Sequence, residues 1–333
     1  MASLELGRTS IRSYAFEIVN YEIERRLLPL LWSVAGNEDG VLDLQDVFRR
    51  FSFDSICRFS FGLDPGCLEL SLPISEFADA FDLASKLSAA RAMAASPLVW
   101  RIKRVLNLGT EKKLRKAIKL INILAQERHR HKLPISWPRH SCFSFNQLLL
   151  AVVQPPEGGA AIRSEADKII GPDQEVTSFE QMQELHYLQA AVHESMRLYP
   201  PIQFDSKFCQ EDDVLPDGTF VQRGTRVTYH PYAMGRIEGI WGPDCLEFKP
   251  ERWLKDGVFF PENPFKYPVF QAGIRVCLGK EMALMEFKSV ALSLVRRFHI
   301  ELATPCPIPR FSPGLTATFG SGLPVLVRGR TIT

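Results

Sequence analysis

Ten residues near the C-terminus, Phe270 to Gly279 (FQAGIRVCLG), constrain this chain more than any other segment. They place Cys277 in a glycine-framed turn directly before the apolar pattern of a long helix, Met282 to Phe298. A thiol at a helix N-terminus lies at the positive end of the helix dipole and beside unpaired backbone N–H groups, and both favour the thiolate. The segment therefore predicts a cysteine that ligates a metal from the start of a helix.

The residues around this cysteine suggest what carries the metal. Gly273 and Gly279 let the backbone turn and approach a flat partner without a Cβ in between, and Arg275 offers a cation to a carboxylate on that partner. A thiolate is a strong ligand of iron, so the partner implied is haem. The other cysteines are expected to be small buried hydrophobic residues, namely Cys57, Cys67, Cys142, Cys209, Cys245 and Cys306.

A second motif, Glu194-Ser-Met-Arg197, lies within an apolar pattern of helical spacing from Met182 to Tyr199. Residues three apart share a helix face, so Glu194 and Arg197 are able to pair. On an exposed helix such a pair contributes only about 0.3–0.5 kcal/mol. An ordinary solvated pair is thus one reading of this motif, and a third motif, Pro250-Glu-Arg-Trp253, supplies the other.

Taken together, the three motifs resemble those of the cytochrome P-450 family. The resemblance implies that Arg252 reaches the carboxylate of Glu194 and completes a buried three-member network with Arg197 behind the haem. Removal of one member of such a network typically costs about 3–5 kcal/mol. The implied role of the network is structural, because it holds the scaffold of the cysteine loop.

The resemblance also implies two sets of site residues around haem b, whose iron Cys277 ligates. The stiff segment from Pro200 to Asp205 is expected to cross one haem face, and the terminal hairpin is expected to enter the substrate cavity. The residues that the resemblance assigns to haem binding are Phe270, Gly273, Arg275, Cys277, Gly279 and Lys207, the last as a cation for a propionate. The residues that it assigns to contact with a small apolar substrate are Ile202, Phe204, Phe319 and Gly320.

The expected fold is mainly α with a small β region, a cytochrome P-450 fold that is incomplete. With 333 residues, of which 46% are hydrophobic and 23% charged, the chain can bury a sizeable core without disulfides. Short strands are expected at 219–222 and 226–229. We expect an N-terminal helical part (1–132), an atypical linker (133–160) and a haem-ligand part (161–333), with N-terminal helices at 10–34, 42–61, 74–93 and 110–131.

Two departures from the family pattern follow from the sequence. Family members carry a long helix across the haem with an Ala/Gly-Gly-x-Asp/Glu-Thr motif, and this chain has no such string; the proline-rich and glycine-rich stretch 133–160 stands in its place. That motif supplies an acid/alcohol pair for proton delivery, and general acid assistance is worth roughly 10²–10⁴-fold. The chain also has no stretch of 18 apolar residues for a membrane anchor. Both gaps predict a truncated or differently spliced product.

Three further strings resemble the plant fatty-acid ω-hydroxylase branch: Phe48 to Asp54, Asp205 to Lys207 and Tyr229 to Gly235. The implied function is NADPH- and O₂-dependent hydroxylation of a fatty acid or a fatty-acid-derived substrate, with NADPH-cytochrome reductase as partner. The family acts at the cytosolic face of the endoplasmic reticulum membrane, whereas this chain is expected to be soluble or peripheral. A net charge of +2 does not indicate a nucleic-acid partner. Two alternatives remain open: a relative that binds haem without turnover, and a truncated product without function.

Overall fold

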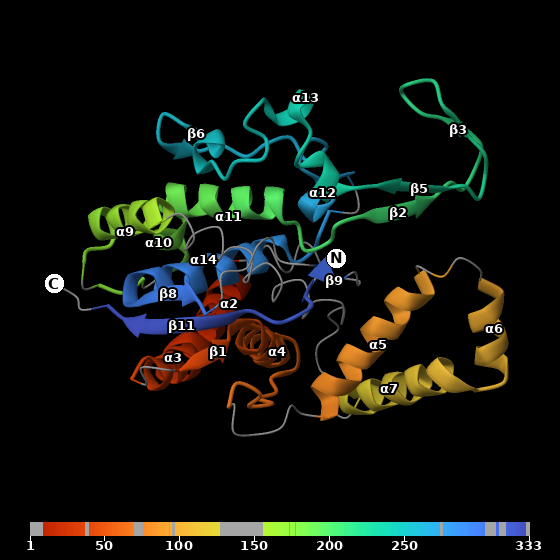
Figure 1. Ribbon diagram of the computed structural model, residues 1–333, viewed down its shortest axis with the longest axis horizontal. Coiled ribbons are helices and arrows are strands. Elements are labelled where there is room, and N and C mark those ends of the chain that lie inside the picture. Colours follow the sequence, from red (N-terminus) through yellow and green to blue (C-terminus); the bar gives the residue numbers. More distant parts are fainter. Residues whose placement is uncertain are drawn as a thin grey trace.

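The computed structural model describes residues 9–36, 40–69, 76–92, 94, 97–126, 156–172, 174–176, 178–273, 276–303, 311–312 and 318–330. It is mainly helical with small antiparallel sheets, which confirms the expected fold class (Figure 1). The helices are α2 (Thr9–Glu22), the π-helical turn η1 (Ile23–Leu27), α3 (Leu28–Ala35), α4 (Leu44–Phe61), α5 (Glu76–Ala92), α6 (Pro97–Val105), α7 (Gly109–Gln126), α9 (Pro156–Ile169), α10 (Phe179–Gln183), α11 (His186–Leu198), α12 (Pro231–Met234), α13 (Glu238–Trp241), the 3-10 turns η2 (Pro250–Trp253) and η3 (Pro268–Phe270), and α14 (Lys280–Arg297).

The strands are short and pair with antiparallel partners. They are β1 (Val41–Asp43), β2 (Asp205–Phe208), β3 (Asp213–Val214), β4 (Phe220–Val221), β5 (Arg226–Tyr229), β6 (Leu254–Lys255), β7 (Val258–Phe259), β8 (Phe298–Leu302), β9 (Phe311–Ser312), β10 (Thr318–Phe319) and β11 (Pro324–Gly329). Strands β1, β11 and β8 form the one three-stranded sheet of the described residues, with β11 in the centre, and the others pair in twos.

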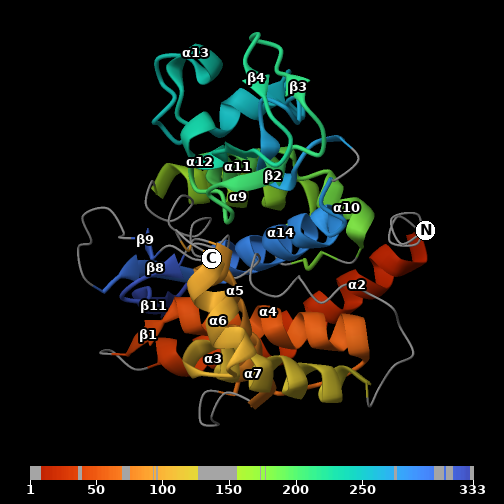
Figure 2. The same cartoon turned by 90° about the vertical axis from the view of Figure 1, so that its right-hand side faces the viewer.

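Helix α14, the helix expected after Cys277, lies in the middle of the main body. In both views it runs between α11 on one side and α2 and α4 on the other (Figures 1 and 2). Its apolar residues, such as Phe287, Val290 and Leu294, are almost fully buried and belong to one large hydrophobic cluster. Because neighbours cover it on opposite sides, α14 fixes the position of whatever precedes its N-terminus.

The N-terminal helices follow the prediction, with two differences of detail. The helix expected at 10–34 is present as α2, η1 and α3 in succession, with a π-helical turn in its middle. The helix expected at 42–61 begins only at Leu44, because Asp43 ends strand β1 and accepts a hydrogen bond from the Gln45 N–H at 3.0 Å. An aspartate whose side chain caps the start of a helix in this way marks a boundary that the spacing of apolar residues does not reveal.

The motif helix expected between 182 and 199 is divided into α10 and α11. The carboxylate of Glu165, from α9, accepts the backbone N–H groups of Tyr187 (2.6 Å) and Leu188 (2.9 Å) and so caps the start of α11. Helix α9 itself begins at Pro156, so residues 156–160 of the stretch expected as a linker are helical. Proline is well suited to the first turn of a helix, where its missing N–H costs nothing. The rest of the predicted linker lies outside the described residues.

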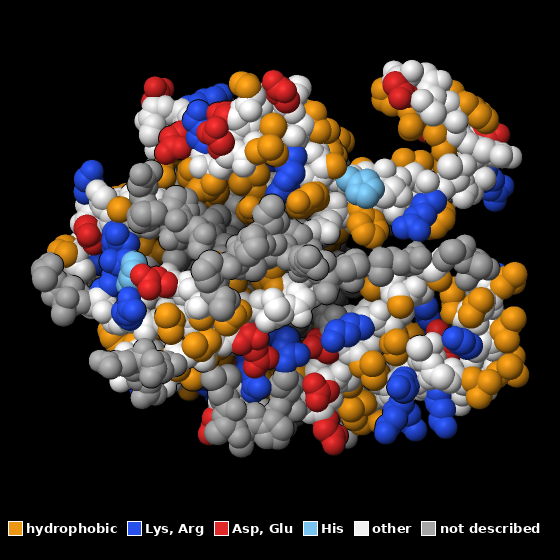
Figure 3. All heavy atoms as spheres, viewed as in Figure 1, with side chains coloured by type: hydrophobic (Ala, Val, Ile, Leu, Met, Phe, Trp, Pro, Cys, Tyr) orange, Lys and Arg blue, Asp and Glu red, His pale blue; other side chains and the backbone are white. Residues whose placement is uncertain are grey.

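Helices α5, α6 and α7 form a lobe beside the main body (Figure 1). The lobe has its own small core, and Arg91 of α5 donates to the buried carboxylate of Glu111 on α7 at 2.8 Å. Helix α6 was not predicted, and its apolar side chains face outward, with Val105 83% exposed (Figure 3). Nowhere in the described ranges does a helix have both the length and the apolar character of a membrane span.

Candidate functional site

The loop that carries Cys277 connects η3 to α14. The chain leaves η3 through Gln271, which has a left-handed φ of 66°, and turns again at Gly273, with φ 68°. The loop then closes on itself, because the N–H of Cys277 donates to the carbonyl of Phe270 at 2.7 Å. Gly279 precedes the first residue of α14 with an ordinary φ of −93°, so of the two glycines expected to allow the turn only Gly273 uses a conformation that favours glycine.

The environment of the Cys277 sulfur combines opposing effects. Burial raises the pKa of the thiol above its usual value, whereas the hydrogen bond from the Gly279 amide and the positive charge of Lys280 lower it. Burial is the largest of the three effects, so the net shift of the thiol pKa is upward. Metal ligands of this kind lose their proton when the metal binds. The amide and Lys280 remain to stabilise the anion.

Glu194 of α11 is the centre of a buried charge network. Its carboxylate, which is fully buried, accepts two bonds from Arg197, at 2.7 and 2.8 Å, and one from Arg252 of η2, at 3.1 Å. It also accepts the indole N–H of Trp253 and the backbone N–H of Lys249, both at 2.9 Å. The three residues singled out from the sequence therefore lie together, and two further donors join them.

Arg197 and Arg252 also bind backbone carbonyls of the segment that follows α12. Arg197 donates to the carbonyls of Gly235, Cys245 (2.6 Å) and Glu247 (3.0 Å). Arg252 donates to the carbonyl of Trp241 at 2.9 Å. A single buried carboxylate thus organises two guanidinium groups, and these in turn fix the course of the chain between α12 and η2.

Lys207, the expected propionate cation, lies on β2 beside the cysteine loop. Its ammonium group is 3.4 Å from the side-chain oxygen of Gln271 and 3.5 Å from Asp205. Lys207 is 54% exposed on its side chain. The amide nitrogen of Gln271 donates to Asp205, and Tyr229 of β5 lies against both of these groups. The small β2–β5 ribbon is thereby joined to the turn that leads to Cys277.

Comparison with known proteins identifies the family. The cytochrome P450 family model matches residues 141–319, which include the Glu194 network and the Cys277 loop. Cytochrome P450 94C1 of Arabidopsis thaliana is 50% identical over an alignment that covers 99% of this chain and 74% of the relative. The chain belongs to the cytochrome P450 family. It is a monooxygenase, and the names of its relatives indicate the 94 type.

Other relatives of this cytochrome P450 have the same type of name. Cytochrome P450 94B3 of Arabidopsis thaliana is 40% identical over 99% of this chain and 73% of its own length, and cytochrome P450 94A2 of Vicia sativa is 37% identical over 99% and 72%. The alignment with cytochrome P450 94C1 runs over 369 residues, 36 more than the 333 of this chain. That relative therefore has residues within the aligned region to which nothing corresponds here.

Membership in the cytochrome P450 family implies a haem with a thiolate ligand, and the donor set fits this group. Cys277 supplies one thiol ligand two residues before Gly279, the N-cap of α14. Its sulfur has an amide donor and a nearby cation, as an anionic ligand requires. Phe270 is half-buried at the start of the loop, with the Lys280 ammonium 5.9 Å from its ring centre. Arg275 lies outside the described residues.

The four expected substrate contacts of this cytochrome P450 have different environments. Ile202 and Phe204 are half-buried just before β2, and the Phe204 ring lies 5.6 Å from that of His230. Phe319 is only 4% exposed and packs in the main hydrophobic cluster, while its backbone N–H donates to the Gln45 side chain at 2.8 Å. Gly320 is exposed in the turn that follows. Phe319 therefore contributes to the core, and its contact with a substrate stays a prediction.

The cysteines other than Cys277 largely follow the expectation. Cys57, Cys67 and Cys245 are buried. Cys209 differs because it is only half-buried. Its S–H donates to the carbonyl of Glu211 at 3.0 Å, as that of Cys245 does to the carbonyl of Arg236 at 3.3 Å. Cys142 and Cys306 lie outside the described residues.

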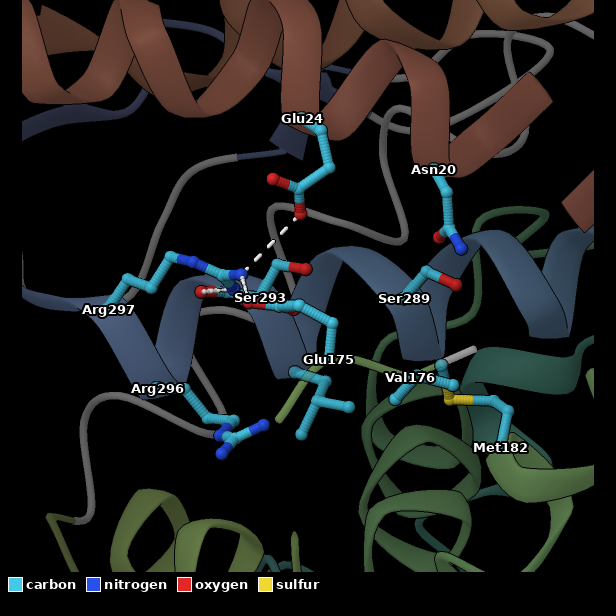
Figure 4. A pocket seen from close by; sticks show the side chains of 10 residues that line it. Asn20, Glu24, Glu175, Val176, Met182, Ser289, Ser293, Arg296 and Arg297 are labelled. Atoms are coloured by element: carbon cyan, nitrogen blue, oxygen red, sulfur yellow. Dashed lines mark hydrogen bonds and ion pairs between the residues drawn. The ribbon is translucent and has the colours of Figure 1, made fainter. Parts of the chain in front are cut away.

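A small pocket of about 90 Å³ opens between α2, η1 and the far end of α14 (Figure 4). Ser289 and Arg297 line it, and Arg297 pairs with both Glu24 and Glu175. Ser289 is nine residues beyond the first residue of α14, which corresponds to roughly 13 Å along the helix axis at 1.5 Å per residue. The pocket is therefore separate from the cysteine loop, and the charges at its edge are already paired.

Sequence reasoning missed two groups that complete the site. Trp253 was part of the third motif, but nothing in the amino-acid sequence showed that its indole binds Glu194. Gln271 lies inside the first motif, and its left-handed φ and its contacts with the β2–β5 ribbon have no signature in the sequence. The only signal available was its position, six residues before the cysteine.

Proposed function

We propose that this chain is a haem-thiolate monooxygenase in which Cys277 ligates the iron of haem b and a fatty acid, or a compound derived from one, is the substrate. The observation that carries the proposal is the position of the Cys277 sulfur, beside the Gly279 amide and directly before α14. The relatives of the 94 type, together with the strings that resemble the plant ω-hydroxylase branch, support the substrate class and hydroxylation at the ω end.

Each part of the chain has a defined task in this proposal. Haem, when bound, supplies the one-electron and oxygen chemistry that no protein side chain provides. The Gly279 amide and Lys280 hold the Cys277 sulfur as an anion, and Phe270 and Gly273 shape the turn before it. The Glu194 network fixes the scaffold behind the loop, and Lys207 offers a cation at the loop's edge. Ile202 and Phe204 are the proposed apolar contacts for the substrate.

Electrons come from a separate redox partner, as in the family, and we propose an NADPH-cytochrome reductase at the cytosolic face of the endoplasmic reticulum membrane. This proposal for the redox partner is supported by the family, whose members receive their electrons from a reductase.

A second function is favoured by one specific observation. The chain has no Ala/Gly-Gly-x-Asp/Glu-Thr string, and the 94C1 relative has residues that this chain lacks within the aligned region. Loss of a proton-delivery pair lowers a rate by roughly 10²–10⁴-fold without removing the thiolate ligand. The second candidate is therefore a relative that binds haem through Cys277 and does not turn over.

One experiment tests the haem assignment and separates the two candidates. The full chain is expressed with haem supplied, and the difference spectrum of the reduced, carbon-monoxide-bound protein is recorded for the wild type, Cys277→Ala and the control Cys209→Ala. We expect the absorption band of a thiolate-ligated haem in the wild type and the control, and its loss in Cys277→Ala. A wild type that takes up no haem, or a Cys277→Ala variant that keeps the band, contradicts the proposal.

Turnover is then measured with the reductase, NADPH and a panel of fatty acids. Hydroxylated product at the ω position supports the monooxygenase, and its absence in a protein that shows the thiolate band supports the second candidate. Compounds of unrelated classes are assayed in parallel, and turnover of these compounds without turnover of any fatty acid would contradict the fatty-acid assignment.

A further inference from the structure

Gln271 has the least common backbone conformation in the cysteine loop. Its φ of 66° is left-handed, a region that residues with a Cβ rarely enter because the side chain approaches the backbone. Among the described residues that are not glycine, only Asn107 and Asp256 share this sign of φ, and asparagine and aspartate tolerate it better than glutamine does. A glutamine persists in such a conformation when its surroundings hold it there.

The surroundings of the Gln271 side chain meet this requirement on both sides of its amide group. The oxygen faces two donors, the hydroxyl of Tyr229 and the ammonium of Lys207, the latter at 3.4 Å. The nitrogen faces an acceptor, the Asp205 carboxylate, at 2.5 Å. Tyr229 lies against Asp205 as well, at 3.1 Å, so its single hydroxyl hydrogen is shared between two acceptors. Each polar atom of the amide therefore has partners of the matching kind.

The Gln271 conformation acts directly on the residue that closes the loop. The peptide unit between Phe270 and Gln271 contains the Phe270 carbonyl, and its orientation depends on the φ of Gln271. That carbonyl accepts the Cys277 N–H at 2.7 Å. The Gln271 N–H itself donates to the carbonyl of Pro268 at 3.0 Å, which fixes the other side of the same peptide unit.

We infer that Gln271 is a positioning residue for Cys277: its side chain, held by Asp205, Lys207 and Tyr229, locks the left-handed turn that aims the Phe270 carbonyl at the Cys277 N–H. The consequence for haem rests on the function proposed above, whereas the effect on the loop does not. The strands β2 and β5 serve in this arrangement as a support for the loop, which Asp205 contacts from 66 residues before Gln271 in the chain.

The test exchanges the roles of Gln271 and Asp205. Gln271→Glu places a carboxylate against the Asp205 carboxylate and should displace the loop. The second change, Asp205→Asn, restores the hydrogen bond with its direction reversed. The amide now at position 205 donates to the carboxylate now at position 271. Gln222→Ala is the matched control, because Gln222 is an exposed glutamine in the turn between β4 and β5.

The first measurement uses the full chain without haem and follows alkylation of Cys277 by peptide mass spectrometry, with Cys209 as the internal reference. Gln271→Glu should raise the Cys277 rate about tenfold relative to Cys209, the factor that corresponds to loss of roughly one hydrogen bond to a charged group. The double variant should react within about twofold of the wild type, because the paired change restores the contact. Gln222→Ala should react as the wild type does.

If Gln271→Glu raises the alkylation rate of Cys209 as well as that of Cys277, the variant has lost its fold. In that case Gln271→Gly is measured in its place. Glycine adopts the left-handed turn without strain but lacks the side-chain contacts, so it should raise the Cys277 rate while leaving Cys209 unchanged. An unchanged Cys277 rate in the folded single variants, or a double variant as reactive as Gln271→Glu, would overturn the inference.

The second measurement is the reduced carbon-monoxide spectrum of the haem-loaded proteins. The fraction with the thiolate band should fall in Gln271→Glu and recover in the double variant; an unchanged fraction overturns the role in ligation. A wild type without any thiolate band refutes the proposed function and leaves the alkylation result to decide on the positioning role alone.

Discussion

Replacement of Glu194 by glutamine is the sharpest test of the buried network, because the two side chains have the same shape. One oxygen of Glu194 accepts bonds from Arg197, Arg252 and the Lys249 amide, and the other accepts from Arg197 and Trp253. The glutamine nitrogen must replace one of these oxygens, so at least two donors then face a donor. The charge that balances the fully buried Arg197 side chain is lost at the same time.

The size of the effect follows from these contacts. Loss of one partner from a buried ion pair costs about 3–5 kcal/mol, which is a large share of the 5–15 kcal/mol that is typical of a folded domain. With a denaturant dependence of about 3 kcal/mol per molar urea, the midpoint of unfolding should fall by about 1 M or more. Trp253 is fully buried and binds Glu194, so its fluorescence reports directly on the network.

The assay is urea unfolding of the full chain, followed by tryptophan fluorescence. Glu251→Gln is the control, because Glu251 is the exposed glutamate beside Arg252 in η2, and it should shift stability by no more than about 0.5 kcal/mol. If Glu194→Gln lowers the midpoint no further than Glu251→Gln does, the network does not stabilise the fold as described.

Two further predictions concern the N-terminal helices. Gly322→Ala should lower the melting temperature in thermal unfolding. Gly322 has a φ of 73°, and a Cβ there would lie 2.4 Å from the carboxylate of Asp43, which caps α4. An unchanged melting temperature would contradict this prediction. Burial raises the pKa of Glu22 from 4.5 to about 7 although Arg26 and Arg58 lower it, so the native state binds this proton more tightly than the unfolded chain does. The stabilisation that this proton gives is complete below pH 4.5 and is lost as the pH rises to about 7. The urea midpoint of Glu22→Gln should therefore depend less on pH in this range than that of the wild type. Parallel plots of midpoint against pH for the two proteins would refute the assignment.

Most of the fold was accessible from the sequence because the relevant signals are local. Apolar spacing located the long helices, including the one that follows Cys277, and turn residues located β5. Boundaries were missed where a distant side chain sets them. Glu165 starts α11 by capping it from another helix, and no pattern within the predicted helix 182–199 contains that information.

The candidate site was predictable to the extent that its residues belong to short motifs. Glu194, Arg197 and Arg252 were placed together through the family resemblance, and the structure shows the bonds that join them. The position of Cys277 before a helix was visible in the sequence, whereas the burial that raises the pKa of its thiol was not. Gln271 was overlooked because a left-handed φ for a glutamine arises from tertiary contacts.

Strand β11 has a consequence for how the protein is made. It pairs with β1 from the beginning of the chain and with β8, so that Leu42 faces Val325 and Val325 faces Leu302. In chain order the middle strand comes after every other strand of the described residues, so β1 and β8 are not joined until it has been synthesised. Contacts across such long separations form slowly. The sheet therefore closes late in synthesis, and the edges of β1 and β8 that β11 covers stay open until then.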